Sequence, residues 1–538
     1  MNLILCAINS KYIHSNLAVR SLAAFLGEYA KHITIKEYTV NNDENMITTG
    51  LFELNPDVLF FSCYIWNIIM IRSVCRVLRK VLPSVKIVFG GPEASPEDRE
   101  FVDFVIEGEG EYAFRELVRQ FLSGESPHVV QKKLNLDEIP FVYNKQLLDE
   151  LGNRILYYEA SRGCPFNCQY CLSAGDSIRF LSLERVFSDL GFFLETRVKQ
   201  VKFVDRTFNC DKKRALEIWR FLINNDNGVT NFHFEIVAEL LDGECFELLS
   251  SVRKGLFQFE IGVQTTNPSV LEVIRRKSNT EKLFTAVALL RPLKIHLHLD
   301  LIVGLPGENF VSVQNSFNDL WQLRPDKIQL GFLKVLKNTG FRRDSEKLGL
   351  VFRSTPPYEV LFTRSLSFKE LIVLKKFEEM LDIFYNSGKF NTSLSFISSF
   401  FESGFLFFET LASYWHTHGY HLAAQSKTSV FTMLYSFCGD NGIPLLYIRD
   451  LLKFDFLLHE NFKGLPPWMN SRPKEQIRKL FPHLSEYSNR QLNACRIETF
   501  SLDVTKYINT GILDKRENDI LFDRSSGEPT YEEVSLER

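Results

Sequence analysis

The sequence predicts a chain of three parts, two α/β regions followed by a helical region. Short apolar runs alternate with amphipathic stretches over residues 1–125, and again from residue 155 to about 337. This alternation is typical of parallel strands joined by helices. Beyond residue 340 the apolar residues recur at helical spacing. A length of 538 residues suffices for three or four domains.

The first α/β region is expected to be a Rossmann-like domain with five parallel strands. Its apolar runs are NLILCAI, ITIKEY, DVLFFSCY, VKIVFGG and FVDFVIEG. Ligands of such sheets lie at the carboxyl ends of the strands. Ser62, Gly90 and Gly91 stand at such ends, although a glycine pair alone would suit any tight turn. We expect this domain over residues 1–130, followed by a linker over 131–150.

The second α/β region contains six apolar runs. They are RILYYEAS, QVKFVD, FHFEIV, LFQFEIGVQ, IHLHLDLIVG and KIQLGFLKVL. Six strands with helices between them predict a (β/α)6 partial TIM barrel over residues 151–345. The chemistry of such a barrel lies at the carboxyl ends of its strands.

The third part, residues 346–538, is expected to be helical and is dense in Phe and Tyr. Its most apolar run, Phe396 to Tyr414, is interrupted by two glutamates and several serines, which favours a buried helix over a membrane span. The last 25 or so residues are acidic and polar, and we expect them to be ordered only by docking. His416 and His418 have no acidic or thiol residue close by in the sequence, which argues against a metal site there.

Composition restricts the partners. The chain has 63 Lys plus Arg against 66 Asp plus Glu, a net charge of −3. This balance argues against a nucleic acid or a membrane as the main partner. The first residues, MNLILCAINSKY, lack a basic region and are too briefly apolar for a signal peptide. We expect a cytoplasmic protein.

Three of the ten cysteines form a compact group, Cys164, Cys168 and Cys171 in SRGCPFNCQYC, and the others are scattered. A disulfide would leave one of the three unpaired, and zinc usually takes four ligands. Three thiolates suit three irons of a cubane cluster whose fourth iron stays open. An iron–sulfur cluster is therefore favoured, with structural zinc or inert thiols as alternatives.

The C-x-x-x-C-x-x-C spacing, with Tyr170 before the last cysteine, resembles the signature of the radical SAM superfamily. The resemblance implies a [4Fe-4S] cluster and S-adenosyl-L-methionine (SAM), which is cleaved to a 5′-deoxyadenosyl radical. FVDRTFN, FEIVAEL, EIGVQTTNPSVLEVIRRKSN and LDLIVGLPGE resemble the HemN-like branch of that superfamily. This implies a set of SAM-binding residues: Glu235, Gln264, Arg276, Asp300, Ile302 and Gly304. Arg275 is adjacent to Arg276 and is the alternative for the cationic position.

The five-stranded domain ahead of the barrel resembles the cobalamin-binding domain of class B methylase-type radical SAM proteins, on VFGGPEAS and IEGEGEYAF. This implies cobalamin beside Ser62, Gly90 and Gly91. The D-x-H-x-x-G motif that supplies a lower cobalt ligand is absent, and His14 is the imidazole available in the corresponding loop. We expect base-off cobalamin with water or no ligand below cobalt, and His14 as the minority alternative.

These resemblances imply an enzyme that methylates an unactivated carbon of a small molecule with SAM and cobalamin. The third part resembles an uncharacterised helical domain that follows the barrel in one subgroup. A reductant protein such as flavodoxin or ferredoxin would supply electrons. Alternatives are a non-methylating rearrangement or oxidation, and a cobalamin- or redox-sensing module. A methylthiotransferase is disfavoured because Cys6, Cys63 and Cys75 lack cluster spacing.

Overall fold

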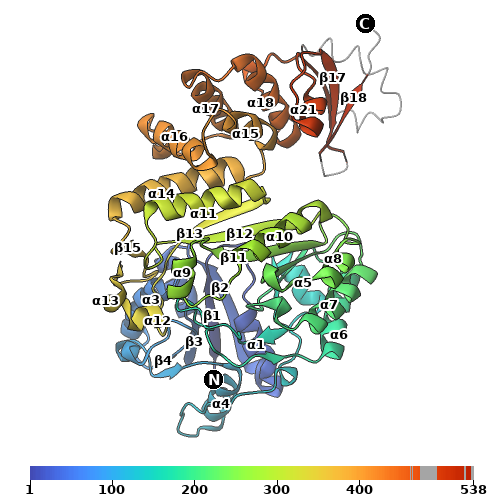
Figure 1. The fold of residues 1–538 in the computed structure, drawn as a ribbon. Coiled ribbons are helices and arrows are strands. Elements are labelled where there is room, and N and C mark those ends of the chain that lie inside the picture. Colours follow the sequence, from blue (N-terminus) through green and yellow to red (C-terminus); the bar gives the residue numbers. More distant parts are fainter. Residues whose placement is uncertain (461, 463–464, 473–493, 526–528, 535–538) are drawn as a thin grey trace. The chain divides into compact units, whose positions relative to one another are not determined.

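The computed structural model describes residues 1–460, 462, 465–472, 494–525 and 529–534 (Figure 1). They form two compact units, residues 1–313 with 330–368 and residues 314–329 with 369–538. The first unit contains the first predicted α/β region and the second one except for residues 314–329. The predicted fold class is confirmed; the domain boundaries stay predictions.

Five parallel strands form the first sheet, in the order β2-β1-β3-β4-β5. Its elements are β1 (Leu3–Asn9), α1 (Leu17–Phe25), β2 (Ile33–Thr39), α2 (Glu44–Glu53), β3 (Val58–Ser62), α3 (Ile68–Val81), β4 (Lys86–Gly90), β5 (Phe104–Ile106) and α4 (Glu111–Ser123). Alternate residues of β1 belong to two different apolar clusters: Ile4 packs with Ile71 of α3, and Leu5 packs with Phe114 of α4. Helices therefore cover both faces, which explains why the whole of β1 is apolar.

Six strands form the second sheet, in the order β13-β12-β11-β10-β9-β6. The strands are β6 (Leu156–Tyr158), β9 (Gln200–Phe203), β10 (Asn231–Ile236), β11 (Phe257–Gln264), β12 (His296–Val303) and β13 (Lys327–Phe332). The helices between them are α6 (Leu183–Glu195), α7 (Lys212–Asn224), α8 (Gly243–Leu249), α9 (Pro268–Val273), α10 (Thr280–Leu290) and α11 (Phe310–Leu323). Five of the six strands fall within their predicted apolar runs and β10 begins one residue before its run, so the (β/α)6 interpretation is confirmed.

Shorter elements complete the first unit. They are α5 (Lys145–Leu151), β7 (Ser161–Arg162), β8 (Arg179–Phe180), α12 (Gly340–Arg343), α13 (Ser345–Leu348), β14 (Val351–Phe352) and β15 (Val360–Phe362). The expected linker ends in α5. Just before it, Tyr143 donates a hydrogen bond through its hydroxyl to the backbone oxygen of Tyr157, at 2.7 Å, and so ties the linker to the barrel.

The second unit is built mainly from helices around an aromatic core. They are α14 (Phe368–Met380), α15 (Asn391–Ser398), α16 (Gly404–Thr417), α17 (Lys427–Asp440), α18 (Leu445–His459) and α21 (Val504–Thr510). The ring centroids of Phe317 and Phe377 lie 4.8 Å apart, and those of Phe377 and Phe405 lie 4.5 Å apart. No helix of the described residues is long and apolar enough to cross a membrane.

Two expectations for this part of the chain are wrong, and His416 has a neighbour in space that its sequence context does not show. Residues 396–414 do not form one helix, because α15 and α16 are separate and Ser403 caps the start of α16. The last residues are not without structure of their own: β16 (Cys495–Phe500), β17 (Asn518–Asp523) and β18 (Thr530–Val534) form an antiparallel sheet. His416 does have an acidic partner, since its Nε2 lies 3.0 Å from Glu379.

Candidate functional site

The cysteine loop begins directly after β7 and returns to β8, the antiparallel partner of β7. Gly163 opens the loop with φ +103°, and a Cβ there would lie 2.6 Å from the backbone oxygen of Ser177. The amide of Cys171 donates to the oxygen of Cys168 at 3.1 Å. This tight turn gathers the three thiols on one side of the loop.

The three thiols and the end of the barrel sheet enclose a cavity of about 180 Å³, which we term the cysteine cavity. Its lining includes Cys164, Cys168, Cys171, Tyr170, Arg206, Thr207, Glu235, Glu260, Gly262, Gln264, Arg276, Lys277 and Asp300. The structure thus brings the three cysteines together with four of the predicted SAM-binding residues. Thr207 Oγ1 lies 3.8 Å from Cys164 Sγ, which places the end of β9 against the loop.

A bulge at the end of β11 shapes one wall of the cysteine cavity. The register of β11 against β12 shifts between Gly262 and Gln264, and Gln264 has φ +72°. A Cβ on Gly262 would lie 2.3 Å from Gln264 Nε2, so a larger residue there would force the Gln264 side chain to move. Gly262 was not predicted as a site residue, although a glycine inside a strand pattern signals a close backbone approach.

Two buried polar atoms of the cysteine cavity lack a hydrogen-bond partner among the described residues, Arg276 Nε and Asp300 Oδ1. Buried polar atoms are rarely left in this state, so both atoms are suited to bind a ligand. Another nitrogen of Arg276, Nη2, donates to the backbone oxygen of Gly262, which orients the guanidinium. Arg275 points elsewhere: its Nε and Nη1 lie 2.9 Å from the side-chain oxygen of Gln169 in the amide orientation that satisfies both groups.

Burial governs the charges in this cavity. It raises the pKa of Glu235 to about 7, with a further rise from the neighbouring charge of Glu260. Burial also raises the pKa of Asp300, which His298 partly offsets. Burial raises the pKa of the Cys171 thiol, and the charge of Arg206 opposes this rise. The cavity therefore favours ligands that bring positive charge to the carboxyl groups.

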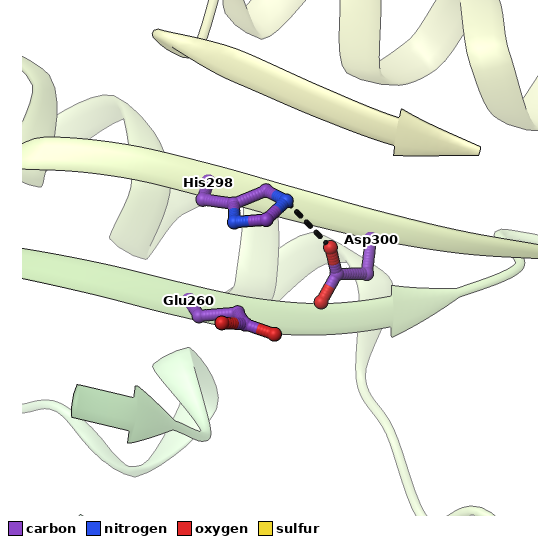
Figure 2. Close-up of side chains that lie close together, drawn as sticks. All are labelled: Glu260, His298 and Asp300. Atoms are coloured by element: carbon purple, nitrogen blue, oxygen red, sulfur yellow. Dashed lines mark ion pairs between the residues drawn. The ribbon is translucent and has the colours of Figure 1, made fainter. Parts of the chain in front are cut away.

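A buried polar cluster lies deeper in the barrel, on the inward side of the same strands (Figure 2). Glu260 Oε2 lies 2.9 Å from both Lys202 Nζ and His233 Nε2. His298 Nε2 lies 2.9 Å from Asp300 Oδ1, though not at a hydrogen-bonding angle. The donor atoms of Glu260, His298 and Asp300 are within 4.8 Å of one another, close enough for a metal ion.

Lys202 already supplies a positive charge at the Glu260 carboxylate. Burial alone would raise the pKa of Glu260, but His233 and Lys202 hold it well below its usual range. We therefore interpret the cluster as a charge-balanced floor of the cysteine cavity. We assign no metal to it.

The remaining two SAM-binding predictions lie outside the residues that line the cysteine cavity. Ile302 is on β12, beyond Asp300. Gly304 has φ +89°, and a Cβ there would lie 2.6 Å from Val360 Cγ1, so its surface is covered by β15. The glycine is needed for packing at this position, and its contact with SAM stays a prediction.

A second cavity, of about 440 Å³, lies at the carboxyl ends of the first sheet, and we term it the crevice cavity. Ser62, Gly90 and Gly91 all line it, as predicted from their strand ends. Gly91 has φ +110°, and a Cβ there would lie 2.6 Å from the oxygen of Cys63. Only glycine fits this turn, which leaves backbone exposed to the crevice cavity.

Arg162, at the start of the cysteine loop, connects the barrel to the turn after β5. Its guanidinium lies 3.2 Å from Glu109, 2.8 Å from Glu111 and 2.7 Å from Glu159. Burial would raise the pKa of Glu111, but Arg162 lowers it. Glu109 and Glu111 of the first domain thus contact the cysteine loop through Arg162.

His14 is not brought to the crevice cavity. Its Nδ1 lies 2.6 Å from the hydroxyl of Tyr157, and its backbone forms a bridge with Ile155 at the edge of the barrel. Burial lowers the pKa of His14, assisted by nearby lysines. The geometry gives His14 a role in domain contact and does not support it as a ligand in the crevice.

A third cavity, of about 330 Å³, extends beneath residues 136–143, and we term it the linker cavity. Arg206 lines this cavity as well as the crevice cavity and the cysteine cavity. Sequence reasoning did not single out Arg206. The available signal was its position in FVDRTFN, directly after a strand end that carries site residues.

Models of three families match the chain. The B12 binding domain matches residues 4–118, the Radical SAM superfamily matches residues 158–320, and a protein family of unknown function, DUF4080, matches residues 346–522. The B12 binding domain match covers the strands that end at the crevice cavity, and the Radical SAM match covers the cysteine loop. The third covers much of the second unit.

Curated relatives align at low identity. The "Uncharacterized methyltransferase PH0819" of Pyrococcus horikoshii is 25% identical over 49% of this chain and 63% of its own length. The "Cobalamin-dependent radical SAM methyltransferase TokK" of Streptomyces tokunonensis is 27% identical over 50% of this chain and 45% of its own. The chain thus spans about half to two thirds of the length of these relatives.

Solved structures share the fold. OxsB, a "Cobalamin-dependent S-adenosylmethionine radical enzyme" solved with aqua-cobalamin, has a TM-score of 0.59 at 16% identity, over 85% of this chain and 79% of that one. The methyltransferase TsrM of Kitasatospora setae, solved with cobalamin and a [4Fe-4S] cluster, has a TM-score of 0.52 at 15% identity, over 66% of this chain and 76% of that one.

Proposed function

We propose that this chain, which belongs to the cobalamin-binding radical SAM proteins, is an enzyme that methylates an unactivated carbon of a small molecule. Its cofactors are a [4Fe-4S] cluster, SAM and cobalamin. The observation that carries the proposal is the cysteine cavity, in which three thiols face four polar side chains from strand ends and their loops.

The donor set of the cysteine cavity fits the cluster and SAM. Cys164, Cys168 and Cys171 would hold three irons and leave the fourth for the amino and carboxylate groups of SAM. Arg276 is buried, fixed by Gly262 and has Nε without a partner, so it would bind the methionine carboxylate.

The carboxyl groups would hold the opposite end of SAM. Glu235 and Asp300 are acceptors for ribose hydroxyls, and Gln264 offers both an acceptor and donors. The deeper cluster of Lys202, His233 and Glu260 fills the barrel with paired side chains. It thereby excludes water from below the reacting groups.

When bound, the cluster and SAM supply one-electron cleavage of SAM to methionine and a 5′-deoxyadenosyl radical, and cobalamin supplies methyl-group transfer. The chain's part is to orient these groups and to keep the site dry. A one-electron donor such as flavodoxin or ferredoxin is the partner that this chemistry needs. Such thiol-based chemistry fits a reducing cytoplasm.

Cobalamin would bind at the crevice cavity, against the backbone at Gly90 and Gly91. We propose the base-off form, because the crevice at the strand ends would take the nucleotide tail of cobalamin, and His14, which is directed to Tyr157, would not replace the base. No histidine of the described residues lines the crevice cavity. We therefore propose that cobalt receives no imidazole from this chain.

A non-methylating reaction is the second candidate. An anaerobic magnesium-protoporphyrin IX monomethyl ester cyclase of Rubrivivax gelatinosus is 22% identical over 57% of this chain and 62% of its own length. A cyclase closes a ring, so relatives of this chain are not methyltransferases alone.

The decisive experiment for methylation measures S-adenosylhomocysteine. The chain is reconstituted without oxygen with iron and sulfide, with or without cobalamin, and incubated with SAM, dithionite and methyl viologen. We expect S-adenosylhomocysteine to form only with cobalamin, because loading cobalamin with a methyl group consumes one SAM. 5′-Deoxyadenosine without any cobalamin-dependent S-adenosylhomocysteine would reject methylation and favour the second candidate.

A further inference from the structure

Arg206 is an exposed cation at the junction of the three cavities, and the described residues include no hydrogen-bond or ion-pair partner for its guanidinium. The other charged side chains of the linker cavity are paired: Arg162 with Glu111 at 2.8 Å and with Glu159 at 2.7 Å, and Arg185 with Asp189 at 2.9 Å. Arg206 is thus the uncompensated charge of that cavity within the described part of the chain.

The position of Arg206 is set by the barrel. It lies in the loop that follows β9, two residues beyond Val204, and the neighbouring Thr207 contacts Cys164. Its charge acts on Cys171 and Glu235 in the cysteine cavity, where it opposes the rise that burial causes in the pKa of each. A group bound to Arg206 would therefore lie next to the cysteine cavity.

The linker cavity itself is walled mainly by apolar and aromatic side chains. They are Leu17, Ala18, Tyr64, Leu136, Ile139, Pro140, Phe141, Val142, Tyr143, Tyr158, Leu181 and Val204. Its volume of about 330 Å³ falls within the range of small-molecule sites. An apolar wall with one free guanidinium, on the side shared with the cysteine cavity, fits an amphipathic anion.

We propose that Arg206 and the linker cavity bind the substrate, and that the substrate is a carboxylate with an apolar body. This inference rests on the proposed function and names its substrate class. The planar guanidinium forms two parallel hydrogen bonds with a carboxylate. One cation matches the single charge of a carboxylate and leaves a phosphate dianion incompletely neutralised.

The geometry assigns each end of the molecule. The carboxylate binds Arg206 at the edge of the cysteine cavity, and the apolar body fills the linker cavity under residues 136–143. Carbons close to the carboxylate would then be nearest to the cysteine cavity. Arg206 is a specificity-determining residue in this assignment.

The test is an equilibrium measurement with octanoate and its neutral counterpart octanamide. Binding of both to the reconstituted chain, loaded with cobalamin and SAM, is followed by isothermal titration calorimetry. The variants are Arg206→Gln, Arg206→Lys and the matched control Arg220→Gln, which removes an exposed arginine from α7, away from the three cavities. The SAM affinity and iron content of each variant are measured in parallel.

We expect the parent to bind octanoate at least tenfold more tightly than octanamide. Arg206→Gln should abolish this preference, Arg206→Lys should keep part of it, and Arg220→Gln should keep all of it. SAM affinity should be unchanged in Arg206→Gln, because Arg276 is the proposed partner of the SAM carboxylate.

Three results would overturn the assignment: equal affinity of the parent for both probes or no binding of either, an unchanged preference in Arg206→Gln, or a loss of SAM affinity in that variant. If Arg206→Gln loses iron, the assignment is judged from the parent's affinity for octanoate relative to octanamide and from the same ratio in Arg206→Lys. The measurement needs no turnover. If the chain forms 5′-deoxyadenosine but shows no Arg206-dependent preference for octanoate, only the carboxylate site is rejected. If it shows that preference but forms no 5′-deoxyadenosine, only the proposed function is rejected.

Discussion

Some residues of the site have buried polar atoms for which the described residues offer no hydrogen-bond partner. Arg276 is the clearest example, since one nitrogen is fixed by Gly262 while Nε has no partner among the described residues. Its neighbour Arg275 is directed to Gln169. Side-chain direction thus separates two adjacent arginines that the sequence leaves equivalent.

Arg276→Ala should weaken SAM binding by about tenfold or more, because a charge-assisted hydrogen bond contributes about 1.5–3 kcal/mol. Equilibrium dialysis of SAM with the reconstituted chain measures this loss. Arg275→Ala is the matched control and should bind SAM like the parent. Loss of SAM binding in the control alone would assign the contact to Arg275 instead.

Glu235→Gln should stabilise the cofactor-free chain above pH 7 relative to the parent. The pKa of Glu235 is raised to about 7 in the folded state from 4.5, so the unfolded state loses its proton first. The parent therefore loses stability as the pH rises from about 4.5 to 7, by up to about 3 kcal/mol.

Glutamine carries no such charge, so the two chains should unfold at similar temperatures at pH 5 and diverge at pH 8. Calorimetric unfolding temperatures across this range provide the measurement. A difference that is constant with pH would show that Glu235 is already ionised in the folded chain at pH 5.

The strands and turns determine which residues lie close together in the fold. The predicted apolar runs located all eleven strands of the two parallel sheets, because strand–helix alternation is a local signal. The sheet of β16, β17 and β18 was missed, since polar residues in the tail obscure its alternation. The cluster of Lys202, Glu260 and His298 was also missed, because the register between strands is a non-local property.

Gly91→Ala tests the turn that forms the crevice cavity. The substitution adds backbone strain at φ +110° and places Cβ 2.6 Å from the Cys63 oxygen. We expect lower thermal stability and loss of cobalamin retained after gel filtration.

Gly124→Ala is the control, since it has a similarly positive φ of +72° but nothing within 4 Å of its Cβ. It should cost only about 1–2 kcal/mol of strain and keep cobalamin. Equal cobalamin retention by both variants would remove the Gly91 turn from the proposed site.

At the scale of the whole molecule, an ion pair and a hydrogen bond join the first α/β region to the rest of the first unit. Arg162 of the cysteine loop binds Glu111 of the first domain, and Tyr358 donates to Glu93 at 2.8 Å. The family matches place a B12 binding domain and a radical SAM domain on the two sides of this contact. The arrangement would place both cofactors beside the linker cavity, which we propose as the substrate site.

Arg162→Met should destabilise the first unit by about 2–4 kcal/mol at pH 7, because it leaves the buried Glu111 unpaired. Glu111 has a lowered pKa in the folded state, so its contribution is present above pH 4.5 and is lost as the pH falls through the folded value. The gap between parent and variant in unfolding temperature should therefore narrow in acid. Arg119→Met, which breaks an exposed pair on α4, should have little effect at either pH.

The central claim is that Cys164, Cys168 and Cys171 hold a cluster that cleaves SAM. The most direct measurement is 5′-deoxyadenosine formed from SAM and dithionite by the anaerobically reconstituted chain, together with its iron content. The parent should bind about four irons per chain and form 5′-deoxyadenosine. The triple Cys→Ala variant should retain neither property. A triple variant that keeps its iron, or a fully loaded parent that forms no 5′-deoxyadenosine, would contradict the claim.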